Sequence, residues 1–117
     1  MNKSVREVVV VDQVPLEREI LVQLLSRRGC AVVAAGSLSE ALGILGSDIA
    51  AVAVCFVEAA QLTGSNALAA FRRNGGCRLV ALVGTGRPPS PAELARQGVT
   101  EILVKPYALD SLTAIVG

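Results

Sequence analysis

Two charged residues stand directly after runs of aliphatic residues and could do chemistry together. Asp12 follows the run Val8 to Val11, and Lys105 follows the run Ile102 to Val104. An aliphatic run that ends on a charge is typical of a buried strand whose carboxyl end meets solvent. In parallel sheets, functional side chains collect at these carboxyl ends. The two charges therefore mark the candidate site.

The chain between these charges alternates between strand patterns and helix patterns. Each strand pattern is a short, uniformly aliphatic run, which indicates a strand covered on both faces. We expect five such strands, at Val8 to Val11, Ala31 to Ala35, Ile49 to Phe56, Leu79 to Val83 and Ile102 to Val104.

Helix patterns separate the strands, and several carry clear start signals. Ser37 with Glu40 forms a capping box, and Ser90, Pro91 and Glu93 combine an N-cap, an N1 proline and a capping glutamate. The first helix should run from Leu16 to a stop at Gly29, with an inward face of Leu16, Ile20, Leu21, Leu24 and Leu25. Two further helices are expected around Ala67, Leu68 and Phe71, and from Leu109 to Val116.

The connections between successive strands are too long for hairpins. Five strands joined by helices require a parallel sheet with right-handed crossovers and helices on both faces. The sequence therefore predicts one α/β domain over residues 1–117, with a doubly wound five-stranded parallel sheet.

The ordered motifs of this chain resemble the CheY-like receiver domain of two-component response regulators. The resemblance rests on Asp12 in VVVVDQVP, on Lys105 and Pro106 in EILVKPY, and on Gly64 after the third strand. It covers nearly the whole chain. It implies a flavodoxin-like strand order of 2-1-3-4-5 and a cis peptide bond between Lys105 and Pro106.

In that family an acidic pair after strand one holds magnesium, an aspartate after strand three accepts a phosphoryl group, and a Ser or Thr after strand four reads it. This chain matches the acidic pair with Asp12, but Gln13 replaces the second acid. Counting back from Gly64 by the spacing usual in the family puts Phe56 at the acceptor position, and a slip of one residue puts Cys55 there. Neither residue is a carboxylate.

The positions that would read out phosphorylation also differ from the family. Counting back from Lys105 puts Val83, followed by Gly84, where the family has Ser or Thr. Ile102 stands where many receivers have a switching Tyr or Phe. The resemblance thus implies a degenerate receiver, with a vestigial phosphorylation pocket of Asp12, Gln13, Cys55, Phe56, Glu58, Val83, Gly84, Lys105 and Pro106.

Three residues of this pocket allow more than one interpretation. We expect Lys105 to pair with Asp12, the alternative being a solvated lysine. Glu58 is expected to be a solvated loop residue, although it could imitate a phosphorylated state. Cys55 should pack in the core, because the chain has no histidine that could activate it as a nucleophile.

Composition excludes several classes of function. Eleven basic and ten acidic residues leave a net charge of +1, and the arginine pairs lack aromatic neighbours, which argues against nucleic-acid binding. No segment reaches the length of a membrane span, so we expect a cytoplasmic protein. Three cysteines without metal-ligand spacing indicate free thiols in a reducing compartment.

We interpret the chain as a phosphorylation-independent bacterial signalling domain, not an enzyme, without a cofactor and with weak or absent magnesium binding. It would regulate an output module by binding a protein partner or a second copy, and it would be the N-terminal part of a longer regulator. The rival interpretations are a receiver with an unconventional acceptor, Glu58 or Cys55, and a flavodoxin-like small-ligand module. The expected interaction face combines helix four, strand five and helix five, with an apolar strip of Ile102, Leu103, Leu112 and Ile115.

Overall fold

The computed structural model describes residues 7–62, 66–73, 77–84 and 90–116. Gly64, which entered the motif spacing above, lies outside them. The strands are β1 (Glu7–Val11), β2 (Ala31–Ala35), β3 (Val52–Glu58), β4 (Arg78–Val83) and β5 (Val99–Val104). The α-helices are α1 (Pro15–Ser26), α2 (Leu38–Leu45), α3 (Asn66–Arg72), α4 (Pro91–Arg96) and α5 (Leu109–Val116), and two 3-10 helices, η1 (Gly46–Ala51) and η2 (Ala59–Gln61), flank β3.

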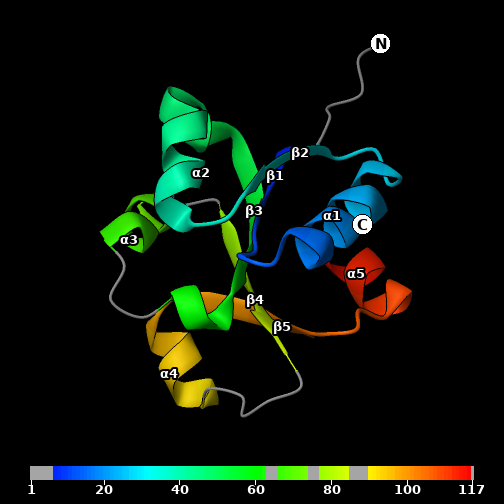
Figure 1. The fold of residues 1–117 in the computed structure, drawn as a ribbon. Coiled ribbons are helices and arrows are strands. Elements are labelled where there is room, and N and C mark those ends of the chain that lie inside the picture. Colours follow the sequence, from blue (N-terminus) through cyan, green and yellow to red (C-terminus); the bar gives the residue numbers. More distant parts are fainter. Residues whose placement is uncertain (1–6, 63–65, 74–76, 85–89, 117) are drawn as a thin grey trace.

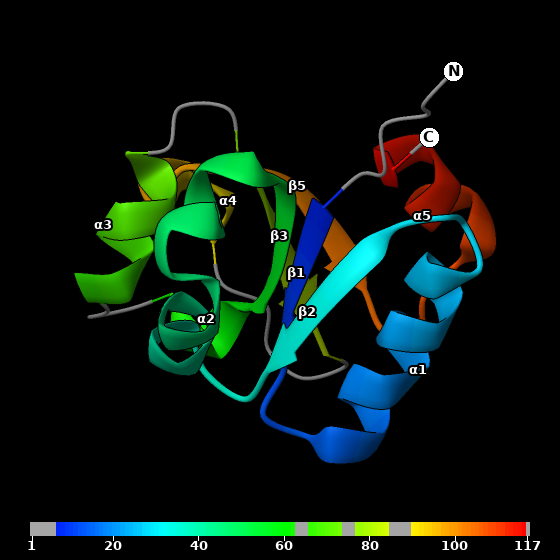
Figure 2. The same cartoon turned by 90° about the horizontal axis from the view of Figure 1, so that it is seen from above.

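All five strands form one parallel sheet in the order β2-β1-β3-β4-β5 (Figure 1). The predicted fold class is therefore confirmed. Helices α1 and α5 cover one face of the sheet, and α2, α3 and α4 cover the other, as the view in Figure 2 shows.

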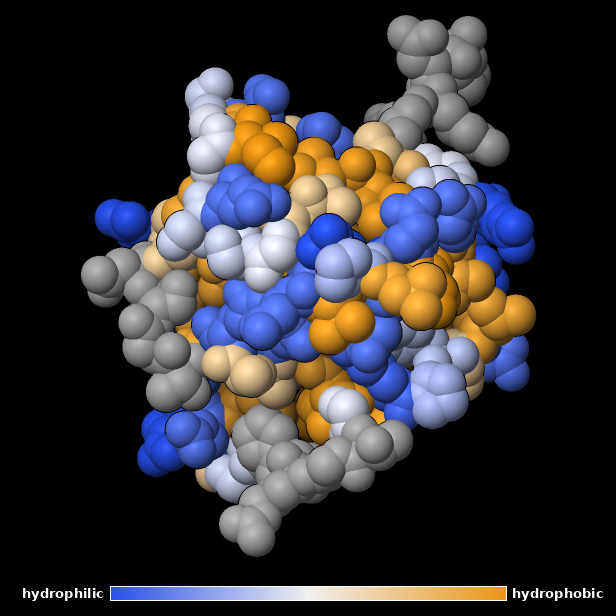
Figure 3. Space-filling view, viewed as in Figure 1, coloured by the Kyte–Doolittle hydropathy of each residue, from blue (hydrophilic) through white to orange (hydrophobic). Residues whose placement is uncertain are grey.

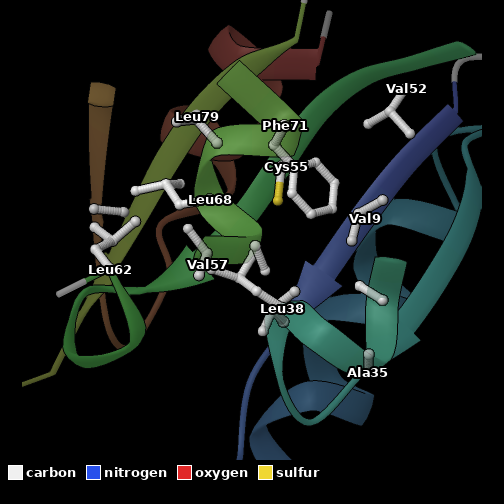
Figure 4. Packing of buried hydrophobic residues seen from close by; sticks show 14 of the residues in the cluster. Val9, Ala35, Leu38, Val52, Cys55, Val57, Leu62, Leu68, Phe71 and Leu79 are labelled. Atoms are coloured by element: carbon white, nitrogen blue, oxygen red, sulfur yellow. The ribbon is translucent and has the colours of Figure 1, made fainter. Parts of the chain in front are cut away.

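Alternate residues of the central strands supply the two halves of the core. Val9 and Cys55 face the α2, α3 and α4 side, whereas Val10 and Phe56 face the α1 and α5 side. Figure 4 shows the first of these clusters, in which Phe71 of α3 packs beside Cys55 and Val9. This two-sided burial explains why the strands read as unbroken aliphatic runs in the sequence.

The two predicted capping signals are present. The Ser37 hydroxyl accepts a hydrogen bond from the Glu40 N–H, and the Ser90 hydroxyl accepts one from the Glu93 N–H, both at 3.1 Å. Each helix therefore begins where its N-cap predicts.

Several details of the predicted elements are wrong, and one is the start of β5, which lies at Val99 and not at Ile102. Ile49 lies in η1, and β3 begins only at Val52 and continues to Glu58. In α1, Leu21 and Leu25 are buried as expected, but Leu16 and Ile20 are exposed because they lie on the side of the helix away from the sheet. Within the described residues, no helix is long and apolar enough to cross a membrane.

Candidate functional site

The carboxyl ends of β1, β3 and β5 bring three charged side chains together. Asp12 follows β1, Glu58 ends β3, and Lys105 follows β5. The β1–β3 register pairs Val11 with Val57, so Asp12 and Glu58 are the next residues on their two strands. A parallel sheet places these ends at one edge, which is where the sequence predicted the site.

The predicted ion pair between Lys105 and Asp12 is present. Lys105 Nζ donates a hydrogen bond to Asp12 Oδ2 at 2.9 Å, and the Asp12 side chain is completely buried. The Asp12 Oδ1 atom accepts a second hydrogen bond, from the Val14 N–H at 2.9 Å. The peptide bond from Lys105 to Pro106 is cis, as the resemblance implied.

Two further carboxylates surround the same ammonium group. Lys105 Nζ also donates to Glu17 Oε1, and Glu58 Oε2 lies 3.9 Å from Nζ. Burial alone would lower the pKa of Lys105, but its hydrogen bonds to Glu17 and Asp12 outweigh that effect and hold the pKa above its ordinary value. The lysine is therefore a fixed positive charge among three acids.

Glu58 is not the solvated loop residue that the sequence analysis expected. Its Oε1 atom accepts hydrogen bonds from the Gln13 N–H at 2.6 Å and from Gln61 Nε2 at 3.2 Å. Gln61 Nε2 also donates to the Gly36 carbonyl at 2.8 Å. Glu58 and Gln61 together thus link the segments after β1, β2 and β3, while the second oxygen of Glu58 faces Lys105.

The acceptor position that sequence counting assigned to Phe56 or Cys55 is wrong. Both side chains are completely buried in the core, on opposite faces of the sheet. The residue at the carboxyl end of β3 is Glu58, only six positions before Gly64. The stretch from the end of β3 to Gly64 is two residues shorter than the family spacing used for the count. The count therefore placed the acceptor position two residues too early, at Phe56.

The core interpretation of Cys55 is confirmed. Its thiol is buried among Val9, Val57 and Phe71, and burial raises its pKa well above the ordinary value. A thiol that resists ionisation is a poor nucleophile. This removes Cys55 from the candidate acceptors.

As far as the structure describes it, up to Gly84, the end of β4 adds backbone but no hydroxyl group to the site. Val83 is buried and belongs to the core cluster under α2, α3 and α4, and Gly84 is exposed. The Val83 carbonyl accepts a hydrogen bond from the Lys105 N–H at 2.9 Å, which fixes the end of β5 to the end of β4. Gln13 supplies its N–H to Glu58 and keeps its side chain exposed.

Sequence reasoning missed three residues of this site. Glu17, Gln61 and Tyr107 were not among the residues predicted for the pocket. The position of Glu17 soon after Asp12 was the available signal, because the first turn of a helix that follows a strand lies at the same edge of the sheet.

Most of the predicted apolar interaction strip is buried. Leu103, Leu112 and Ile115 belong to the core cluster under α1 and α5, and only Ile102 is exposed. A charge at Ile115 would enter the core and unfold the domain instead of testing association. Within the described residues, the exposed large apolar side chains of this region are Ile102, Val104 and Leu109.

Comparison with known proteins agrees with this fold. The profile of the response regulator receiver domain family matches residues 8–117. The chain belongs to this family. None of the curated proteins matches the chain in sequence.

Solved structures of receiver domains are similar throughout the chain. A response regulator receiver domain protein from Clostridium thermocellum has a TM-score of 0.79 at 21% identity, and the match covers 96% of this chain and 91% of that one. NtrX from Brucella abortus, solved in complex with ADP, has a TM-score of 0.80 at 20% identity. That match covers 97% of this chain but 25% of NtrX, so this receiver domain spans about a quarter of the NtrX chain.

A third relative was solved with a signalling partner. The receiver domain of Ssk1 from Saccharomyces cerevisiae, in a co-crystal with the histidine phosphotransfer protein Ypd1, has a TM-score of 0.75 at 18% identity. The match covers 99% of this receiver domain and 89% of the Ssk1 chain. Identities this low establish the shared fold, and the functional comparison rests on the residues of the site.

Tyr107 gives this receiver domain a spectroscopic probe of its site. It is the single tyrosine, and no tryptophan is present. Its hydroxyl is buried and, within the described residues, has no hydrogen-bond partner. Burial raises the pKa of Tyr107 from 10.0 to about 12, and the charges of Lys105, Asp12, Glu17 and Glu58 also act on it.

We expect the tyrosinate absorbance of the folded domain to appear near pH 12, against about 10 in urea. The folded state holds this proton more tightly than the unfolded state. The free energy of unfolding therefore keeps the full contribution of Tyr107 below pH 10, and this contribution is lost as the pH rises toward 12. Tyr107→Phe should remove the absorbance change and lessen the alkaline loss of stability. A folded-state midpoint at pH 10 would contradict this description of the pocket.

Proposed function

We propose that this receiver domain signals without phosphorylation, in one fixed state, by binding a protein partner or a second copy. Glu58 stands at the end of β3, where the family has its phosphorylated aspartate. Glutamate is one methylene longer than aspartate, so its carboxylate extends into the space where a phosphoryl group on the shorter residue would lie. The domain would then carry its own negative charge at the activating position.

The contacts of Glu58 support this proposal. Its Oε1 atom accepts hydrogen bonds from the Gln13 N–H and the Gln61 amide, and its Oε2 atom lies 3.9 Å from Lys105 Nζ. In the family the same lysine pairs with the phosphoryl group. A carboxylate whose oxygens already have such partners gains little from a further reaction and is held in one position.

The acidic residues of the site do not suit magnesium. Magnesium prefers several oxygen ligands, and the carboxylates that bind it must be free to coordinate the ion. Here the Asp12 carboxylate already binds the Lys105 ammonium and the Val14 N–H, and Gln13 replaces the second acid. Within the described residues, no group of three acidic, cysteine or histidine side chains is arranged to hold a metal. We therefore propose that magnesium binds weakly or not at all.

A receiver that is phosphorylated on Glu58 is the second candidate. It is favoured by the position of Glu58, a carboxylate close to a lysine. It would still require a divalent cation to neutralise the phosphoryl oxygens, which the pairing of Asp12 with Lys105 opposes. The two candidates differ in a direct mass measurement.

We expect acetyl phosphate with magnesium to leave the intact mass unchanged, and beryllofluoride with magnesium to leave the melting temperature unchanged. The reason is that one oxygen of Glu58 already accepts hydrogen bonds and the Asp12 carboxylate is already paired with Lys105. A receiver domain that retains the family's aspartate and acidic pair serves as the positive control. A gain of one phosphoryl group that disappears in Glu58→Gln would instead establish the second candidate.

A further inference from the structure

Charge is divided between the two ends of the sheet. Each helix carries the chain back toward the amino ends of the strands, so first turns lie at the carboxyl end and last turns at the amino end (Figure 2). Acids occupy the first turns of four helices, at Glu17, Glu40, Glu93 and Asp110. Arginines occupy or directly follow the last turns of α1, α3 and α4, at Arg27, Arg28, Arg72, Arg73 and Arg96. This arrangement suits each helix dipole, and it also gives the domain an acidic end and a basic end.

The acidic end contains a pocket of three carboxylates, those of Asp12, Glu17 and Glu58, around the Lys105 ammonium. Figure 3 looks onto this end and shows hydrophilic side chains gathered across its middle. The guanidinium of Arg18 lies nearby and donates to the Asp12 backbone carbonyl at 2.8 Å. The carboxylates still outnumber these two bases. The remaining negative charge can be reached from solvent, because the Glu17 side chain is 43% exposed.

Two adjacent arginines at the end of α3, Arg72 and Arg73, form an open part of the basic end. Both are exposed, and they border a hollow of about 330 Å³ that Ala69 also lines. The Arg72 Nε atom lies 3.1 Å from the position that a Cβ atom at Gly98 would take, which places it beside the turn from α4 to β5. Among the described residues, neither arginine of this α3 arginine pair has an ion-pair or side-chain hydrogen-bond partner. Both guanidinium groups are therefore open to a partner.

Two other arginines at the basic end are already engaged. Arg28 donates two hydrogen bonds to Thr113 Oγ1, at 3.1 and 2.8 Å. Arg78 forms an ion pair with Glu101. The arginine pair after α1 thus has one guanidinium bound within the domain, whereas the α3 arginine pair has two that are unpaired in the part of the chain that the structure describes.

We infer that the acidic pocket binds the α3 arginine pair of a second copy, so that copies of this receiver domain associate head to tail. This inference rests on the proposed function and deepens it, because it names the partner of the same pocket. A guanidinium group matches a carboxylate in a bidentate geometry. Because the two surfaces lie at opposite ends of the sheet, each copy gives its arginines to one neighbour and receives those of another. A net charge of +1 keeps the general repulsion between copies small.

Head-to-tail binding does not stop at a dimer. The two surfaces differ, so the interface is heterologous, and each added copy leaves one acidic pocket and one arginine pair unused. The association should also depend strongly on salt. Raising the salt from about 0.01 M to about 1 M shortens the Debye length from about 30 Å to about 3 Å and should dissociate the copies.

Sedimentation from micromolar to millimolar protein tests this geometry. At low salt the average mass of the unchanged domain should rise past that of a dimer. Arg72→Glu with Arg73→Glu should weaken the association at least about tenfold, because it places acids against the acidic pocket. Arg27→Glu with Arg28→Glu is the matched control, since it changes the net charge equally at the end of another helix, and it should retain the association.

Mixing two variants separates head-to-tail association from a closed dimer. Glu17→Lys should disable the acidic pocket, and the Arg72 and Arg73 double variant lacks the basic surface, so each alone should be monomeric. Their mixture should give a one-to-one dimer and nothing larger, because one functional pocket and one functional arginine pair remain. Glu17→Lys adds a positive charge beside Lys105, so the milder Glu17→Gln serves as its companion. Glu17→Gln should remain folded and weaken the association at least about threefold.

Several results would overturn the inference: a monomer at millimolar concentration and low salt, an assembly that ends at a dimer, or an association unchanged in Glu17→Gln. Equal loss in the two arginine double variants would also overturn it, because it would indicate a general effect of net charge. A mixture of folded variants that forms no complex would do the same. The phosphodonor experiment uses dilute protein in high salt, where the copies are separate, so its outcome concerns Glu58 alone.

Discussion

The double variant Gln13→Asp, Glu58→Asp should bind magnesium and beryllofluoride together, whereas the unchanged domain should not. Aspartate at position 58 is one methylene shorter, so it withdraws from the Gln13 N–H, which Glu58 contacts at 2.6 Å, and leaves room for a phosphoryl group. Aspartate at position 13 restores the second acid of the family's pair beside Asp12. Together the changes supply a nucleophilic carboxylate and a cation site.

The expected gain can be measured as stabilisation by the ligand. A ligand present at about ten times its dissociation constant stabilises the folded state by about 1.4 kcal/mol. For a domain of this size that raises the melting temperature by roughly 4 to 8 °C. Acetyl phosphate should also add one phosphoryl group to the double variant.

The control for this experiment keeps the cation site and removes the acceptor. Gln13→Asp, Glu58→Asn retains the shorter side chain at position 58 but has no nucleophilic carboxylate, so acetyl phosphate should not modify it. If the double variant also stays unmodified while folded, Glu58 does not occupy the acceptor position and the proposed function loses its main support.

The fold could be predicted from the sequence because its signals are local. Aliphatic runs, serine N-caps and helix-stopping glycines each act within a few residues, and their order defines an alternating α/β chain. Burial of the strands on both sides made the runs easy to recognise. The strand order came from the family resemblance, since local patterns do not contain it.

The site was predicted less well because it depends on register and on loop length. Asp12 and Lys105 were found because each directly follows its strand. Glu58 was misassigned because the count ran through a connection of variable length, from Gly64. The β1–β3 register, which places Glu58 beside Asp12, appears only once the strands are paired.

The prediction of the apolar interaction strip was wrong for a different reason. The strip combined Ile102 and Leu103, although consecutive residues of a strand point to opposite faces of the sheet. Leu103 therefore packs under α5, and Ile102 faces solvent. The apolar pattern of α1 was ambiguous in the same way, because a stripe that includes Leu16 and Ile20 is wider than the surface the sheet covers.

Lys105→Met should destabilise the domain by about 3 to 5 kcal/mol, because it leaves a buried carboxylate without its counter-charge. Asp12 is completely buried, and among the residues that the structure describes its carboxylate keeps only the hydrogen bond from the Val14 N–H once the ammonium is removed. The loss would be a large part of the total, since domains of this size are stable by about 5 to 15 kcal/mol. Urea unfolding at neutral pH measures it.

Two companion variants show whether the buried pair causes that loss. Glu17→Gln removes a partner whose side chain is 43% exposed, so it should cost at most about 1 kcal/mol. Asp12→Asn combined with Lys105→Met removes both buried charges and should recover much of the stability lost in Lys105→Met alone, because a neutral amide costs less to bury than an unpaired carboxylate. If Lys105→Met were no more destabilising than Glu17→Gln, the Lys105 ammonium would contribute no more than a surface charge.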